Sequence, residues 1–303
     1  MDPRAMPAAE LPLSPALVRR LLAEQHPDLA DLPVEVLANG WDNLVCRLGD
    51  DLLVRLPRRA ASAALVAHEQ RWLPELAARL PLPVPAPVRT GRPGAGYPWA
   101  WSVVPYLRGE IAARTPPADP YAAALALGGF LRALHVPAPP DAPANPVRGI
   151  PLAGRAAGVG RQLPHLEGAE RAAAGRLWEA AVAAPAWDGP PLWLHGDLHP
   201  ANVLIDAGAV AAVIDFGDVT GGDPATDLAV AWMLLPARAA REEFRRAYGR
   251  ADGATWLRAR GWALALALVF LTHSADNPLM AAVGRRTLDA VLADGPEPGP
   301  ASR

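Results

Sequence analysis

Three polar residues at a fixed spacing constrain this 303-residue chain more than any other feature. Asp197 lies in a His-Gly-Asp-Leu-His-Pro-Ala-Asn segment that ends at Asn202, and Asp215 follows the apolar run of residues 210–214. Asn202 comes five residues after Asp197, and Asp215 comes eighteen residues after it. An amide and a carboxylate suit a hard cation such as Mg²⁺, while the other carboxylate can act on a hydroxyl. The spacing therefore predicts a hairpin over residues 192–216 whose polar side chains serve one site.

Three segments resemble the aminoglycoside phosphotransferase family, bacterial small-molecule kinases that are related in fold to protein kinases. They are residues 195–202, 214–218 and 223–228. The spacing is also that of a protein-kinase catalytic loop and its metal-binding aspartate. The resemblance implies an α+β, protein-kinase-like fold, with a small antiparallel-sheet lobe over a larger, mainly helical lobe. We expect a nucleotide-binding lobe over residues 1–107 and a catalytic, substrate-binding lobe over residues 108–303.

The same resemblance implies a kinase that transfers the γ-phosphoryl group of ATP or GTP to a hydroxyl of an aminoglycoside-like antibiotic or a related small alcohol. Asp197 would be the catalytic base or hydroxyl-orienting group, and Asn202 and Asp215 would bind Mg²⁺. Macrolide kinases and metabolic-alcohol kinases of the same family are alternatives. A nucleotide-binding pseudokinase is an alternative from another class. The acceptor, its reacting hydroxyl, the choice between ATP and GTP and a role in resistance stay open.

The chain contains no lysine, so its 29 basic residues are all arginines. By the resemblance, Arg55 occupies the strand position that holds a lysine in many kinases. A guanidinium can contact phosphate oxygens in a bidentate way, so Arg55 is expected to bind the nucleotide. Glu69 on the following helix is its expected ion-pair partner, and Glu75 is the alternative.

Two further segments are expected to contact the nucleotide. Gly40 lies where kinases fold a loop over the phosphates, although this segment has a single glycine. Residues 103–109 should form the hinge between the lobes. There the Pro105 carbonyl and the Leu107 N–H could pair with a purine, since proline lacks a donor but keeps its carbonyl.

The histidines around Asp197 allow two readings. In the family, His195 packs and hydrogen-bonds under the catalytic loop, and Asp227 supports that loop from below. A His-x-Asp-x-His pattern, which includes His199, can also bind zinc, as in a metal-dependent hydrolase. The other histidines show no ligand-like pairing, so a structural role is favoured. Asp223 resembles a helix N-cap, and the role of Asp218 stays open.

Composition narrows the classes of partner. The net charge of −2 gives no basic footprint for nucleic acid. Cys46 is the only cysteine, which excludes an internal disulfide and fits a cytoplasmic protein. The most apolar run, residues 261–271, is shorter than the roughly twenty residues that span a bilayer, so we expect a core helix and no membrane partner. No signal peptide is visible, a small hydroxylated substrate is the expected partner, and the oligomeric state stays open.

Local signals predict the elements outside the hairpin. The N-terminal third should be rich in strands and the remainder helical. A long proline-rich connection is expected over residues 137–151, and loose tails over residues 1–13 and from residue 294. Pro74 should break a helix near residue 73. The expected elements are helices over residues 14–25 and 60–80, strands over 34–37, 44–48 and 52–56, and one or two strands within 97–107.

Overall fold

The computed structural model describes residues 8–294, and the chain divides into two compact units that are described separately. Within the described residues, the first unit holds residues 8–79, 83–108 and 214–217. The second holds residues 80–82, 109–213 and 218–294. The α+β class expected from the sequence is confirmed, because the first unit contains an antiparallel sheet and the second is mainly helical.

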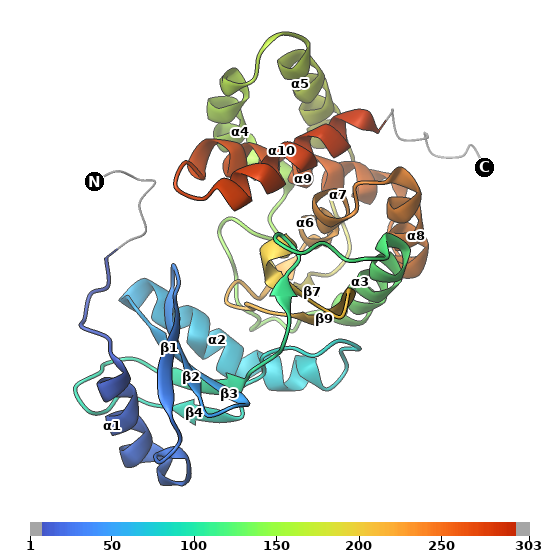
Figure 1. Ribbon diagram of the computed structural model, residues 1–303. Coiled ribbons are helices and arrows are strands. Elements are labelled where there is room, and N and C mark those ends of the chain that lie inside the picture. Colours follow the sequence, from blue (N-terminus) through green and yellow to red (C-terminus); the bar gives the residue numbers. More distant parts are fainter. Residues whose placement is uncertain (1–7, 295–303) are drawn as a thin grey trace. The chain divides into compact units, whose positions relative to one another are not determined.

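The first unit is built on a five-stranded antiparallel sheet (Figure 1). Its strands follow the order β1-β2-β3-β5-β4, so the three strands predicted from the turn signals form one meander. The hairpin turns begin at Gly40 and Gly49, and Gly49 has φ +60°. The strands are β1 (Val34–Asn39), β2 (Asn43–Leu48), β3 (Leu52–Pro57), β4 (Arg89–Gly91) and β5 (Trp101–Pro105).

Two helices belong to this unit, α1 (Pro15–Gln25) and α2 (Ala60–Ala77). The N-cap prediction for α1 is confirmed, since the Ser14 side chain accepts the Leu17 N–H and proline occupies the first helical position. The apolar face of α1 packs with strand side chains, including Cys46, into one buried cluster. The helix α2 follows β3 directly. It carries Glu69, which lies fourteen residues after Arg55 of β3.

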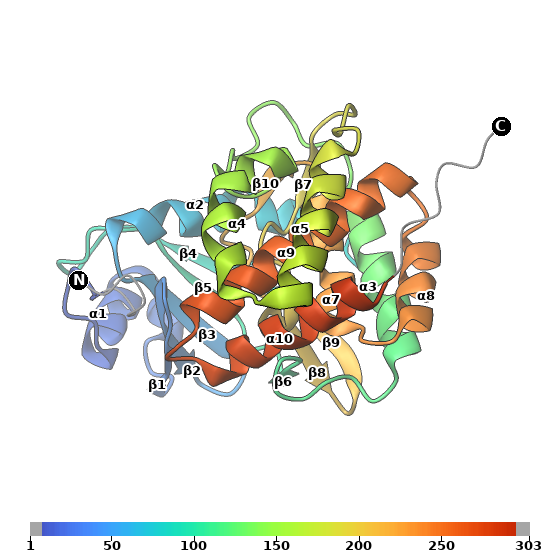
Figure 2. The same ribbon diagram turned by 90° about the horizontal axis from the view of Figure 1, so that it is seen from above.

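The second unit is mainly helical. Its longest helix, α9 (Gly253–His273), packs against α10 (Pro278–Ala293) and α5 (Gly168–Ala183), as Figure 2 shows from above. Asp252 caps α9 by accepting the Thr255 N–H at 2.8 Å. The other α-helices are α3 (Pro120–Leu134), α4 (Ala156–Gln162), α6 (Ala225–Leu228), α7 (Val230–Leu234) and α8 (Arg238–Tyr248).

Short strands interrupt the helices of this unit and flank the segment that contains Asp197 and Asn202. The strand β7 (Leu192–Leu194) pairs with β10 (Thr220–Gly222), while β6 (Glu110–Ile111), β8 (Val203–Asp206) and β9 (Ala209–Val213) form a second sheet. The residues between β7 and β8 therefore have both ends fixed by backbone hydrogen bonds. The second unit also contains three short 3₁₀ helices, Leu152–Arg155, Leu163–His165 and Pro200–Asn202. The first unit contains one, Pro27–Leu29.

One expectation about the helices was wrong. The helix α2 does not break near residue 73, because Pro74 lies inside its last turns, where buried Trp72, Leu73 and Leu76 hold the chain in place. The apolar run of residues 261–271 belongs to a 21-residue helix, which by length and composition could cross a membrane. The helix is longer than the apolar run, but 72% of its most apolar window is buried, so the expected core helix is confirmed.

The expected tails fall mostly outside the described residues, which exclude residues 1–7 and 295–303. Their described ends are held in place. Glu10 accepts the Ala60 N–H, and Asp294 pairs with Arg241 at 2.6 Å.

Candidate active site

The loop after β7 depends on a glycine. Gly196 has φ +86°, and a Cβ at this position would lie 2.3 Å from the carbonyl oxygen of Asp218. This backbone conformation is favourable only for glycine, and the close approach leaves no room for a side chain. The turn at Gly196 thus directs the chain from β7 into the segment that carries Asp197.

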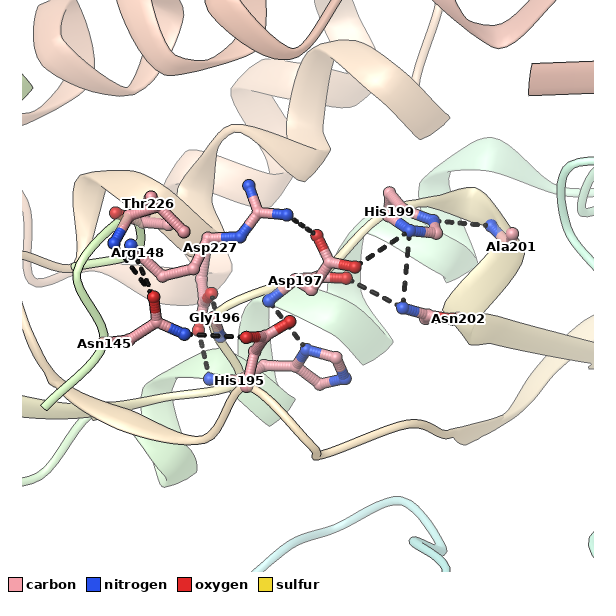
Figure 3. A network of polar contacts seen from close by, with 12 residues as sticks. Asn145, Arg148, His195, Gly196, Asp197, His199, Ala201, Asn202, Thr226 and Asp227 are labelled. Atoms are coloured by element: carbon pink, nitrogen blue, oxygen red, sulfur yellow. Dashed lines mark hydrogen bonds and ion pairs between the residues drawn. The ribbon is translucent and has the colours of Figure 1, made fainter. Parts of the chain in front are cut away.

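Asp227 in α6 holds the beginning of this loop (Figure 3). Its carboxylate accepts the backbone N–H groups of His195 at 2.7 Å and Gly196 at 2.9 Å. Nε2 of His135 lies 3.2 Å from the same carboxylate, and the Tyr248 hydroxyl lies 2.9 Å from the other ring nitrogen. These groups are buried, so each hydrogen bond within the protein replaces a hydrogen bond to water. Asp227 therefore fixes the backbone of His195 and Gly196, and its predicted role in supporting catalysis stays a prediction.

The two histidines of the loop are used in hydrogen bonds. Nδ1 of His195 accepts the Asp197 N–H, and Nδ1 of His199 accepts the Ala201 N–H. His195 is fully buried. Within residues 8–294, no three or more His, Cys, Asp or Glu side chains are arranged to hold a metal. The geometry therefore favours the structural reading of His195 and His199 over the zinc alternative.

The carboxylate of Asp197 has a cationic or polar partner on each oxygen (Figure 3). Arg148 donates to Oδ1, and Nε2 of His199 lies 3.3 Å from Oδ2. Burial by itself would raise the pKa of Asp197, but His199 and Arg148 outweigh burial and hold the pKa well below its usual range. Asp197 is therefore an ionised hydrogen-bond acceptor at neutral pH.

Sequence reasoning missed Arg148, which lies in the proline-rich connection. The loop is fixed at both ends of this residue: the Arg148 N–H donates to Asn145, and the Gly149 N–H donates to Thr226. Asn145 also donates to Asp218 at 2.7 Å. A long connection without its own regular structure is a pointer to a functional loop, and this was the signal available in the sequence.

Asn202 ends the 3₁₀ turn Pro200–Asn202 in the second unit. Its Nδ2 donates to the backbone carbonyl of Asp197 at 2.9 Å. With the amide nitrogen used in this way, the amide oxygen is the atom suited to a hard cation. This geometry fits the predicted role of Asn202, which stays a prediction.

The first unit contains Arg55, the residue predicted to bind the nucleotide phosphates. Nη1 of Arg55 lies 2.8 Å from both oxygens of Glu69, and Nη2 lies 3.6 Å from Asp215. Burial alone would lower the pKa of Arg55, but the two carboxylates outweigh burial and raise it. Glu75, the alternative partner, pairs instead with Arg79 on the exposed side of α2. Arg55 is thus a fixed, charged group next to an exposed carboxylate.

Asp215 has an unusual backbone. Its φ is +64°, a left-handed conformation that costs about 1–2 kcal/mol for a residue other than glycine. Phe216 is fully buried, and its backbone donates to Glu69. The segment therefore holds Asp215 in a strained conformation while its carboxylate is exposed to solvent. Such strain is concentrated at functional sites.

The remaining predicted nucleotide contacts lie in the same unit. The Gly40 N–H donates to the Asn43 carbonyl, and the Gly40 carbonyl accepts from Arg58 at 2.8 Å. Pro105 ends β5, and Leu107 follows it outside any strand. Their roles toward a nucleotide stay predictions.

This fold and this set of side chains define a kinase-like phosphotransferase. The chain belongs to the phosphotransferase enzyme family, whose model matches residues 33–262. No curated protein matches the chain in a direct sequence comparison.

Solved structures show the same fold at low sequence identity. An aminoglycoside phosphotransferase in complex with GDP and kanamycin is 20% identical, with TM-score 0.67, over 91% of this chain and 98% of that one. A macrolide 2'-phosphotransferase from Brachybacterium faecium is 24% identical, with TM-score 0.61, over 95% and 100%. An ADP-bound aminoglycoside phosphotransferase is 16% identical, with TM-score 0.57, over 92% and 98%.

Proposed function

We propose that this protein transfers the γ-phosphoryl group of ATP or GTP to a hydroxyl of a small molecule. The observation that carries the proposal is Asp197, a carboxylate kept ionised by Arg148 and His199 in a loop that Asp227 holds in place. An ionised carboxylate fixed in this way can accept a hydrogen bond from the acceptor hydroxyl and orient it for attack. Structural relatives with GDP or ADP bound support a nucleotide as donor.

The other residues of the proposal bind the donor. Asn202 and Asp215 offer one amide oxygen and one carboxylate, a donor set that fits Mg²⁺. When bound, Mg²⁺ supplies positive charge that neutralises the phosphates. Arg55 adds a charged guanidinium held in place by Glu69. Gly40, Pro105 and Leu107 are the remaining predicted nucleotide contacts.

The family leaves several acceptors open. The structural relatives include enzymes for aminoglycosides and for macrolides, so an antibiotic or a metabolic alcohol fits the same proposal. A pseudokinase would not need the Asp197 arrangement. A reaction that uses a nucleoside triphosphate, together with the lone cysteine Cys46, favours the cytoplasm as the location.

The decisive experiment is nucleotide turnover measured against a panel of aminoglycosides, macrolides and small alcohols. Asp197→Ala should abolish transfer while nucleotide binding stays near the wild-type level, because the carboxylate acts on the acceptor and not on the purine. A variant that keeps more than about a tenth of the wild-type turnover would remove Asp197 from the mechanism. Absence of turnover by the wild type with every acceptor would favour the pseudokinase.

A further inference from the structure

The turn between β1 and β2 is held by the residue that follows β3. Because β2 and β3 pair antiparallel along their length, the chain after β3 lies beside this turn. Nη1 of Arg58 donates to the Gly40 carbonyl at 2.8 Å and lies 3.4 Å from the Trp41 carbonyl oxygen. The backbone N–H of Arg58 donates to the Asp42 carbonyl at 2.8 Å. One residue therefore holds three consecutive carbonyl oxygens of the turn.

The side chain of Arg58 is a buried charge that depends on these carbonyls. Only 4% of Arg58 is exposed. Among residues 8–294, the hydrogen-bond acceptors of its guanidinium are the carbonyls of Gly40 and Trp41, and its Nε is buried without a partner. If the turn moved away, a buried guanidinium would lose these acceptors, which is unfavourable. The burial of Arg58 therefore opposes displacement of the turn.

A second set of contacts holds the tip of the turn. Oδ1 of Asp42 accepts the Ser62 hydroxyl at 2.6 Å and lies 3.2 Å from Nη2 of Arg59. Ser62 is buried in the first turn of α2, so the helix fixes its position. The turn is thus attached both to the end of β3 and to the beginning of α2.

The contacts with Arg58 also orient the N–H groups of the turn. In a trans peptide, the C=O and the N–H of the next residue point in opposite directions. The carbonyls of Gly40 and Trp41 face Arg58, so the N–H groups of Trp41 and Asp42 face away from it. Within residues 8–294, neither N–H group donates to an acceptor. Neighbouring free N–H groups in a turn are suited to an anion.

We propose that Arg58 is a positioning residue for the nucleotide, because it fixes the turn so that the N–H groups of Trp41 and Asp42 are directed to the phosphates. The proposal rests on the proposed kinase function and adds Arg58 to it. Protein kinases place several glycines in this loop, whereas this segment has one, Gly40. A turn that is ordered before the nucleotide arrives loses less conformational entropy on binding.

Nucleotide binding tests the first half of this inference. Calorimetry compares ADP and GDP with adenosine and guanosine for the wild type, Arg58→Met, Arg58→Lys and Ser62→Ala. Arg58→Met should weaken diphosphate binding by about tenfold and leave nucleoside binding unchanged, since only the phosphates meet the turn. Arg58→Lys should recover part of the loss, and Ser62→Ala should give a smaller loss. Arg19→Met is the matched control, because Arg19 donates to the Val34 carbonyl at the other end of β1.

The mobility of the turn tests the second half without any nucleotide. A nitroxide label is attached at residue 41 after Trp41→Cys, since the wild-type Trp41 side chain is half exposed and Cys46 is fully buried. The spectrum should show an immobilised label when Arg58 is present and a mobile one after Arg58→Met. Arg19→Met should leave the label immobilised. Melting temperatures check that each variant folds.

The outcomes separate this inference from the kinase function. A label that stays immobilised after Arg58→Met overturns the inference, and weaker ADP binding in that case would mean direct contact between Arg58 and the phosphates. Equal loss of nucleotide and nucleoside binding also overturns it, because the loss would then be a general one. If Arg58→Met does not fold, Arg58→Lys and Ser62→Ala provide the same two comparisons. Failure of the kinase function would appear as absent turnover by a wild type whose ADP or GDP binding still responds to Arg58, whereas a wild type that binds neither would overturn both.

Discussion

Nη1 of Arg55 lies 2.8 Å from both carboxylate oxygens of Glu69, and the pair is buried in the first unit. Kinases generally place a lysine and a glutamate in these two positions. In a chain without lysine, the arginine keeps the ion pair and leaves Nη2 directed to Asp215 at 3.6 Å. The charge of the usual lysine is therefore preserved, while the geometry of its contacts is that of a planar fork.

Substitution of Arg55 should weaken nucleotide binding and turnover together. Arg55→Ala removes a charge-assisted contact worth roughly 1.5–3 kcal/mol, which corresponds to about 10- to 100-fold in affinity. Arg55→Lys should recover part of this loss. Nucleotide titration and steady-state kinetics measure both effects.

Glu69 provides the control for this pair. Glu69→Ala should give a smaller defect, and the double variant should be less than additive, because the two residues act as one unit. Glu75→Ala, which removes an exposed pair with Arg79 on the same helix, should leave the kinetics unchanged. Wild-type kinetics for Arg55→Ala would show that Arg55 is structural, and Arg58 or Arg59 would then be the next candidates for the phosphates.

Turnover should require Mg²⁺ or Mn²⁺ and should not respond to a zinc chelator. The predicted ligands Asn202 and Asp215 offer oxygen atoms, which suit hard cations, whereas zinc prefers nitrogen and sulfur ligands. Asp215→Asn should raise the Mg²⁺ concentration needed for half-maximal activity. Stoichiometric zinc in the purified protein, with loss of activity on its removal, would instead support the hydrolase alternative.

Gly196→Ala should destabilise the protein and abolish transfer. The substitution forces a left-handed conformation on alanine, which costs about 1–2 kcal/mol, and places a Cβ 2.3 Å from the Asp218 carbonyl oxygen. Thermal unfolding and turnover measure the two effects. Gly129→Ala is the matched control, since Gly129 lies inside α3 with open space at its Cβ, and it should stabilise the protein by about 1 kcal/mol. Equal melting temperatures for the two variants would contradict this account of the loop.

Asp252→Ala should cost about 1 kcal/mol of unfolding free energy at neutral pH, because it removes the N-cap of α9. Hydrogen bonds from Thr255 lower the pKa of Asp252 in the folded protein. A carboxyl whose folded pKa is lowered stabilises the protein above its unfolded pKa, and the stabilisation is lost as the pH falls through the folded pKa. The difference between wild type and Asp252→Ala should therefore shrink in acid. Denaturant titrations at neutral and acid pH test this, and a difference independent of pH would exclude the ionised cap.

Short-range signals predicted much of the fold and part of the site. The strands of the first sheet follow from turn residues such as Gly40 and Gly49, which need only a few neighbouring positions to be recognised. The pairing of Arg55 with Glu69 was expected from the resemblance to kinases, with Glu75 as the alternative. The predicted break at Pro74 was wrong because it depended on packing: buried neighbours on α2 outweigh the lost backbone hydrogen bond.

Contacts between residues far apart in the sequence show where such reasoning stops. Arg148 reaches Asp197 from 49 residues earlier in the chain, within a connection that has no periodic pattern. Arg155 and Trp262 are farther apart still, and a 3₁₀ turn brings one to a core helix that contains the other. Each contact depends on how loops and helices pack, so no local feature of the sequence predicts it.

The first unit includes residues 214–217, although the residues on both sides of this segment belong to the second unit. A ribosome therefore releases the whole sheet of the first unit long before it makes Phe216, whose backbone donates to Glu69. During synthesis the Arg55–Glu69 pair therefore lacks its contacts with Phe216 and Asp215 until residues 215 and 216 have been made. A gene fragment cut after residue 108 would lack both, so a single cut cannot divide the protein into two complete folding units.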